Sequence, residues 1–221
     1  MDFCGNSGFS NDSVGYYTIM TSITDKKTAN RSTVLTNGTL GMILFVATEV
    51  MFFSGLISSF IINGSDNVGA WPPKWQPRLP VVNTALNTLL LLASGVTMYL
   101  AVRNINKDKE QGKISRNLIL TMILGGSFVA IQGVEWINLL QAGMTSTSSV
   151  FGAFFYTIIG AHGFHALMGV LYLVYVSTKI IKTTEYKVKK NLIHVLSIYW
   201  YFVVLLWPVL YVLVYILPSK N

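Results

Sequence analysis

Charged residues and cysteines are scarce in this chain. Only 11% of the 221 residues are charged, whereas soluble domains contain about 25%. The single cysteine, Cys4, excludes a disulfide framework within the chain and a cluster of thiolate metal ligands. Hydrophobic residues make up 52% of the sequence, and the mean hydropathy is +0.53. This balance predicts an integral membrane protein rather than a large soluble core.

Five apolar runs are long enough to cross a bilayer, which takes about 20 helical residues. Lipid-exposed backbone must satisfy its own hydrogen bonds, so all five are predicted to be helices and the fold all-α. We expect a polar N-terminal segment at 1–35 without a cleaved signal peptide, a five-helix transmembrane domain at 36–217, and a short tail at 218–221. The predicted spans are Leu40–Ile62, Val81–Val102, Leu118–Ala142, Val150–Val176 and Leu192–Leu217.

Basic residues fall mainly on one side of these spans. By the positive-inside rule, this predicts a cytoplasmic N-terminus and a C-terminus outside. The net charge of +7 is therefore a topology signal, and no nucleic-acid partner is expected. On the predicted cytoplasmic side lie Lys26, Lys27, Arg31, Arg103, Lys107, Lys109, Lys113, Arg116, Lys179, Lys182, Lys187, Lys189 and Lys190; on the other lie Lys74, Arg78 and Lys220.

Polar side chains form stripes on three predicted spans. Ionisable groups at membrane depth are costly and therefore candidate functional groups. We expect the stripes to face one another, with a hydrogen bond from Glu135 to a histidine, as an intramembrane polar lock that fixes helix packing. The stripes are Asn83, Asn87 and Ser94 on the second span, Gln132, Glu135 and Asn138 on the third, and His162 and His165 on the fourth.

The same groups allow two other interpretations. Glu135, His162 and His165 would supply three ligands for a metal-dependent membrane enzyme. They would also serve as the proton relay of a small proton-coupled transporter, although no span has the central break common in transporters. His194 lies at the cytoplasmic end of the last span, far in depth from the other histidines, which argues against bis-histidine haem ligation.

Glu49 stands alone in the first span. Its own helical face carries bulky side chains, whereas the opposite face carries Ala47, Ser54 and Ser58, which would let another helix approach closely. We therefore expect Glu49 to point toward lipid and to be protonated at neutral pH, because desolvation disfavours the charged form. The alternative is a partner group on another subunit.

Several motifs in this order resemble subunit III of the haem–copper respiratory oxidases, over Thr36 to Leu217. The first holds Glu49, the second follows the family's Leu-Pro-x-x-Asn-Thr helix, and the third contains its Gly-x-His-Gly-x-His signature. In the last helix, Tyr201 and Val204 replace the family's usual His and Asp. The stretches are "ATEVMFFSGL", "RLPVVNTALNTLLLLASGVTMYLA", "GVEWINLLQAGMTSTSSVFGAFFYTIIGAHGFHALMGVLYL" and "IYWYFVVLLWPVLY".

The resemblance implies a non-catalytic, metal-free accessory subunit in the five-helix form of the family. It would support a proton-pumping terminal oxidase through packing, lipid binding and maintenance of proton uptake. Haem and copper would lie in the partner catalytic subunit I. Other oxidase subunits and membrane phospholipid would be further partners. The location that the resemblance implies is the bacterial cytoplasmic (inner) membrane, which the chain would cross several times. A related chain of a nitric oxide reductase is the alternative.

Overall fold

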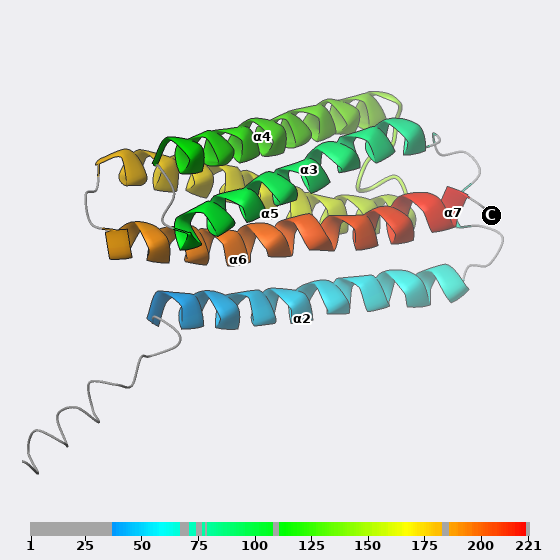
Figure 1. Ribbon diagram of the computed structural model, residues 1–221. Coiled ribbons are helices and arrows are strands. Elements are labelled where there is room, and N and C mark those ends of the chain that lie inside the picture. The colour runs from blue at the N-terminus through cyan, green and yellow to red at the C-terminus, as the bar shows by residue number, and fades with distance from the viewer. Residues whose placement is uncertain are drawn as a thin grey trace, which may run out of the picture. The chain divides into compact units, whose positions relative to one another are not determined.

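The computed structural model describes residues 37–66, 71–73, 77, 79–107, 111–182 and 186–219 (Figure 1). The predicted N-terminal segment lies outside the described residues, as does much of the proline-rich connection after the first span. The described part is all helical and contains no strand. Its helices are α2 (Asn37–Asp66), α3 (Val81–Asn106), α4 (Gln111–Gln141), α5 (Val150–Lys182), α6 (Tyr186–Leu210), the π-helix η1 (Tyr211–Ile216) and the short α7 (Leu217–Ser219).

The prediction of five membrane-spanning helices is confirmed. The described residues contain five helices long and apolar enough to cross a membrane, with α6 and η1 forming the last of them. The helices extend beyond the predicted apolar runs because polar residues at the ends, such as those at Gln111–Asn117, continue the helix outside the apolar stretch. Which side of a membrane each end faces stays a prediction.

Helix α6 lies at the centre of the packed helices and contacts α2, α3 and α5 (Figure 1). Two tryptophans of α6, Trp200 and Trp207, are fully buried. Their indole N–H groups donate to Ser94 at 3.2 Å and Thr88 at 2.8 Å, both on α3. Burying an indole at membrane depth leaves its donor without water, so these two bonds fix the register of α6 against α3.

Two glycines make room for Trp200. A Cβ atom at Gly125 of α4 would lie 2.5 Å from the Trp200 ring, and one at Gly169 of α5 would lie 2.8 Å from it. Small residues of this kind let membrane helices pack closely around a large side chain. Trp200 of α6 therefore contacts all three of α3, α4 and α5.

The last span changes its hydrogen-bond pattern near the end. Pro208 has no backbone N–H and removes one bond of the α-helical ladder. Three residues later the chain continues as the π-helix Tyr211–Ile216. The buried Tyr215 belongs to this turn, so the irregular segment carries a polar side chain into the helix contact.

Helix α2 is packed on one side only. In its most apolar stretch 6% of the residues are buried, against 33–50% in the other four spans. The buried side chains are Phe53 and Phe60, which belong to the bulky face that carries Glu49. The expectation that the face with Ala47, Ser54 and Ser58 packs against the bundle is wrong, because all three residues are exposed. Aromatic contacts with α5 and α6 hold α2 instead.

Candidate functional site

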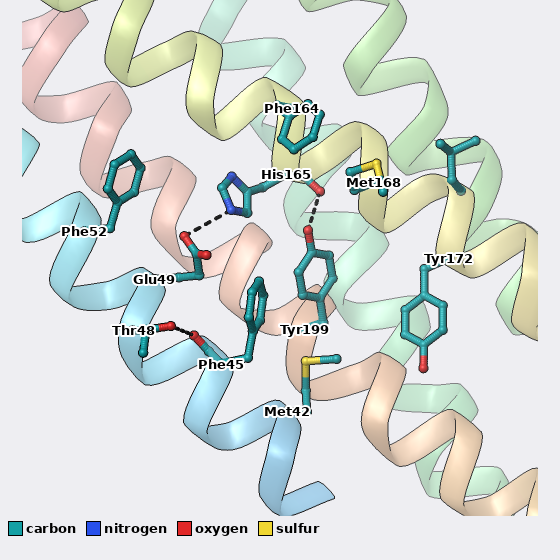
Figure 2. Close-up of a pocket in the computed structure, with 11 residues that line it drawn as sticks. Met42, Phe45, Thr48, Glu49, Phe52, Phe164, His165, Met168, Tyr172 and Tyr199 are labelled. Carbon is teal, nitrogen blue, oxygen red and sulfur yellow. Dashed lines mark hydrogen bonds and ion pairs between the residues drawn. The ribbon is translucent and has the colours of Figure 1, made fainter. Parts of the chain in front are cut away.

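Glu49 has a partner within the chain. Its Oε2 atom lies 3.1 Å from Nε2 of His165 on α5, and the two side chains are mostly covered (Figure 2). The interaction joins α2 to α5 next to the ring of Phe53. The structure thus differs from the expectation of an unpaired carboxyl or of a partner on another subunit.

The other ring nitrogen of His165 bonds to the backbone of its own helix. Nδ1 lies 2.7 Å from the backbone oxygen of Ala161. A carbonyl oxygen only accepts, so Nδ1 donates this bond and Nε2 faces Glu49. The bond to Ala161 thus orients the ring so that the imidazole and the carboxyl group are partners within the chain, as polar groups at membrane depth require.

Glu49 and His165 line a groove of about 890 Å³ between α2, α5 and α6 (Figure 2). Tyr199 of α6 closes one part of the groove and donates to the backbone oxygen of His165 at 2.9 Å. Thr48 donates to the backbone oxygen of Phe45 at 2.7 Å, so its hydroxyl is already satisfied. The remaining wall is apolar, formed by Met42, Phe45, Phe52, Phe164, Met168 and Leu171 together with the ring of Tyr172.

A second polar group joins α3, α4 and the end of the last span. Thr84 donates to Oε2 of Glu135 at 2.9 Å in a buried contact. Asn87 donates to the backbone oxygen of Phe128 at 3.2 Å and lies 3.4 Å from Oε1 of Gln132. Gln132 in turn donates to the hydroxyl of Tyr215 at 3.1 Å. Asn87, Gln132 and Glu135 thus take part in contacts through Thr84, Phe128 and Tyr215, and their role as a polar lock that fixes helix packing stays a prediction.

Two predicted members of the stripes face away from the bundle. Asn83 and Asn138 are exposed, one residue before Thr84 and three after Glu135, respectively. The placement of Asn83 in the polar lock is therefore wrong. The 100° step from Asn83 to Thr84 carries the threonine inward, and Thr88 follows it on the same face.

The expected hydrogen bond between Glu135 and a histidine is absent among the described residues. Glu135 bonds to Thr84, and His165 bonds to Glu49. His162 is fully buried against Trp207, with ring centroids 4.9 Å apart. Neither of its ring nitrogens has a hydrogen-bond partner among the described residues. The two histidines thus serve different contacts although they lie three residues apart.

Sequence reasoning missed Thr84, Thr88 and Tyr215 as members of these contacts. Thr84 and Thr88 lie at the i, i+4 spacing of one helical face, and this signal was available in the sequence. Helical periodicity could not identify Tyr215, because the orientation of this side chain depends on the π-helical turn. His194 bonds to Asn106 at 3.1 Å, near the end of α3, apart from these groups.

The described residues contain no group of three or more His, Cys, Asp or Glu side chains arranged to hold a metal ion. Glu135, His162 and His165 therefore do not converge as a ligand set. The chemistry present is the pairing of neutral or mutually neutralised polar groups between helices. This defines a polytopic membrane protein whose polar residues join helices and border an apolar groove.

Comparison with known proteins agrees with this class. The family model described as "Cytochrome c oxidase subunit III" matches residues 15–219. A relative from Nocardia farcinica, called probable cytochrome c oxidase subunit 3, is 32% identical over 80% of this chain and 86% of its own length. One from Mycobacterium leprae with the same name is 29% identical over 90% and 96%. The Xenopus laevis cytochrome c oxidase subunit 3 is 35% identical over 79% and 67%.

The chain belongs to the cytochrome c oxidase subunit III family. The resemblance noted in the motifs is thereby confirmed. Membership makes the chain an integral membrane protein and an accessory subunit of a respiratory oxidase complex.

Proposed function

We propose that this chain is the non-catalytic subunit III of a proton-pumping haem–copper terminal oxidase. It packs beside catalytic subunit I, which holds the haems and copper and reduces oxygen to water, and it contacts other subunits of the complex. The bacterial cytoplasmic membrane is the proposed location, with the N-terminus in the cytoplasm. The match to bacterial relatives called probable cytochrome c oxidase subunit 3, over 86% and 96% of their own length, supports this assignment.

The groove at Glu49 is the proposed site for membrane phospholipid. Its apolar wall suits an acyl chain, and its volume of about 890 Å³ falls in the range of lipid-sized ligands. The observation that carries this proposal is the 3.1 Å pair of Glu49 and His165 in the groove wall. Because the carboxyl group and the imidazole are each other's partners, an acyl chain can lie against this wall without facing an unpartnered polar group.

The lipid and the polar pair together would support proton uptake by the catalytic subunit. An acyl chain in the groove would exclude water from the Glu49 carboxyl and preserve its contact with His165. The polar contacts of Thr84, Glu135 and Gln132 would act as the lock that maintains helix packing during turnover. We expect loss of either to shorten the active lifetime of the complex rather than to stop electron transfer at once.

Mass spectrometry of the intact purified complex tests the proposal. We expect the chain to co-purify with a haem- and copper-containing subunit and to retain phospholipid. Met168→Trp should fill the groove and reduce the bound lipid, because Met168 lines it. Val174→Trp is the matched control, since Val174 is also exposed on α5 but does not line the groove. Isolation of the chain as a self-sufficient redox enzyme, or unchanged lipid in Met168→Trp, would contradict the proposal.

A further inference from the structure

A second cavity lies between α4 and α5, closed at its inner end by α6. Its volume is about 310 Å³. Gln132, Gly133 and Trp136 of α4 form one wall, and Trp207 of α6 forms the inner end. On α5 the wall contains Ile159, Gly160, His162, Gly163, Phe164 and Leu167. The proposed lipid groove lies on the other side of α5, with Phe164 bordering both spaces.

Three nitrogen atoms in this wall have no hydrogen-bond partner among the described residues. They are Nδ1 and Nε2 of His162 and Nε1 of Trp136, and all three are buried. His162 is 0% exposed, so its ring reaches neither lipid head groups nor bulk water. Buried polar atoms are nearly always hydrogen-bonded, so these three point to a ligand within the cavity.

The donor and acceptor pattern defines the chemistry of that ligand. A neutral imidazole offers one N–H donor and one acceptor nitrogen, and an indole offers one N–H donor. A ligand that satisfies all three must both accept and donate hydrogen bonds. Water does so, whereas an acyl chain satisfies none of them. A water molecule takes about 30 Å³ of liquid volume, so the cavity has room for several.

The glycines of the wall keep this space open. A Cβ atom at Gly133 would meet nothing within 4 Å, whereas one at Gly163 would lie 3.0 Å from the Trp136 ring. Gly163 thus lets the Trp136 ring lie close to α5, and Gly133 leaves the volume beside it unfilled. The amide of Gln132, which also bonds to Tyr215, brings the α3–α4 polar contacts to the edge of the same cavity.

We propose that the cavity between α4 and α5 is a hydration site, in which ordered water bridges His162 and Trp136. Water here would satisfy the buried histidine, for which the described residues offer no partner, and Gln132 lines the same cavity. This inference does not depend on the proposed lipid binding.

Hydroxyl-radical labelling with ¹⁸O-water tests the site in the assembled complex, in lipid nanodiscs. Short X-ray pulses generate radicals from water molecules in contact with a side chain, and mass spectrometry locates the ¹⁸O. Trp207 and Trp200 form a matched pair, because both are fully buried on α6 and both have a satisfied N–H. Only Trp207 lines the cavity. We expect Trp207 to be labelled severalfold more than Trp200; equal labelling would overturn the proposal.

Two variants locate the water. Gly133→Leu fills the cavity and should lower Trp207 labelling to the level of Trp200. Gly126→Leu is the control, because Gly126 lies two turns earlier on α4, also has open space, and does not line the cavity. If Gly133→Leu does not accumulate, Gly133→Val replaces it. His162→Phe keeps the ring contact with Trp207 but removes both nitrogens, and should also lower the labelling. Full labelling in either cavity variant would contradict water bound at this site.

Discussion

Helix α2 and the helices α3 to α6 are equally suited to a membrane but are held in different ways. The four later spans share buried polar contacts and close glycine–tryptophan packing along their length. Helix α2 has aromatic side chains, one polar pair with His165 and little burial. Apolar character therefore decides that a segment enters the membrane, but it does not decide which helix the segment packs against.

The physical reason is that lipid tails are as apolar as leucine. A leucine that moves from lipid into a helix contact loses no water, so little hydrophobic free energy is gained. Close packing and hydrogen bonds remain as the forces between helices. Glycine, threonine and buried tryptophan supply them in α3 to α6, and α2 has few of these residues on its packed face.

The largest effect is expected at the contact between Gly125 and Trp200. Gly125→Ala places a Cβ atom 2.5 Å from the Trp200 ring, which is too close for any real contact. Overpacking of this kind costs about 1–3 kcal/mol. We expect a lower thermal unfolding midpoint of the complex and less chain in the membrane.

Gly126→Ala is the control for that change, because its Cβ atom would meet nothing within 4 Å. A glycine-to-alanine change in an open helical position gains up to about 1 kcal/mol in helix propensity. The two adjacent variants should therefore shift stability in opposite directions. Equal shifts would mean that Trp200 does not pack as described.

A smaller effect is expected when Thr84 loses its hydroxyl. Thr84→Val keeps the shape of the side chain but removes the hydroxyl that donates to Glu135. Hydrogen bonds between membrane helices contribute about 0.6 kcal/mol on average and up to about 1.7 kcal/mol. We expect a loss in this range, measured as thermal unfolding of the complex. Asn83→Ala should change the thermal unfolding less, because Asn83 is exposed. A larger loss of stability in Asn83→Ala than in Thr84→Val would mean that Asn83 takes part in the polar contact.

The sequence was sufficient to predict the five spans, their all-α structure and the family. It also placed Asn87, Gln132 and Glu135 on polar helical faces, and the structure buries all three side chains. These follow from composition and helical periodicity, which are local properties of the chain. The face on which α2 packs was not predictable in the same way. Phe53 and Phe60 resemble lipid-facing residues in sequence, and only their contacts with α5 and α6 distinguish them.

The partner of Glu49 was missed for a related reason. The sequence placed His165 near Glu135, because both lie on polar stripes, and depth alone did not discriminate between the two carboxyls. The hydrogen bond from Nδ1 to Ala161 orients the ring of His165 and directs Nε2 toward α2. The orientation of this ring depends on how three helices pack together, and the helical periodicity of the sequence does not predict that packing.

The pair between Glu49 and His165 is the main polar link of α2, and its loss should have a modest effect on stability. His165→Phe removes Nε2, and the expected loss is about 0.6 kcal/mol, the average for such bonds. The carboxyl would then have lost its His165 partner and would be open to a reagent that enters the apolar groove. We expect Glu49 to react faster with a hydrophobic carbodiimide, measured by mass spectrometry of the labelled peptide. Slower or unchanged labelling would argue against the pair.

The smallest effect is expected on the outer face of α2. Ala47→Leu adds a large side chain where the structure has an exposed residue, so the change in unfolding free energy should stay within about 0.5 kcal/mol. Phe53→Ala is the comparison, because Phe53 is 1% exposed and contacts Phe202 and the ring of His165. It should loosen α2 and raise its accessibility to protease in the assembled complex. A strong loss of stability in Ala47→Leu, with Phe53→Ala tolerated, would mean that α2 packs through its small residues after all and that its bulky face is turned to lipid.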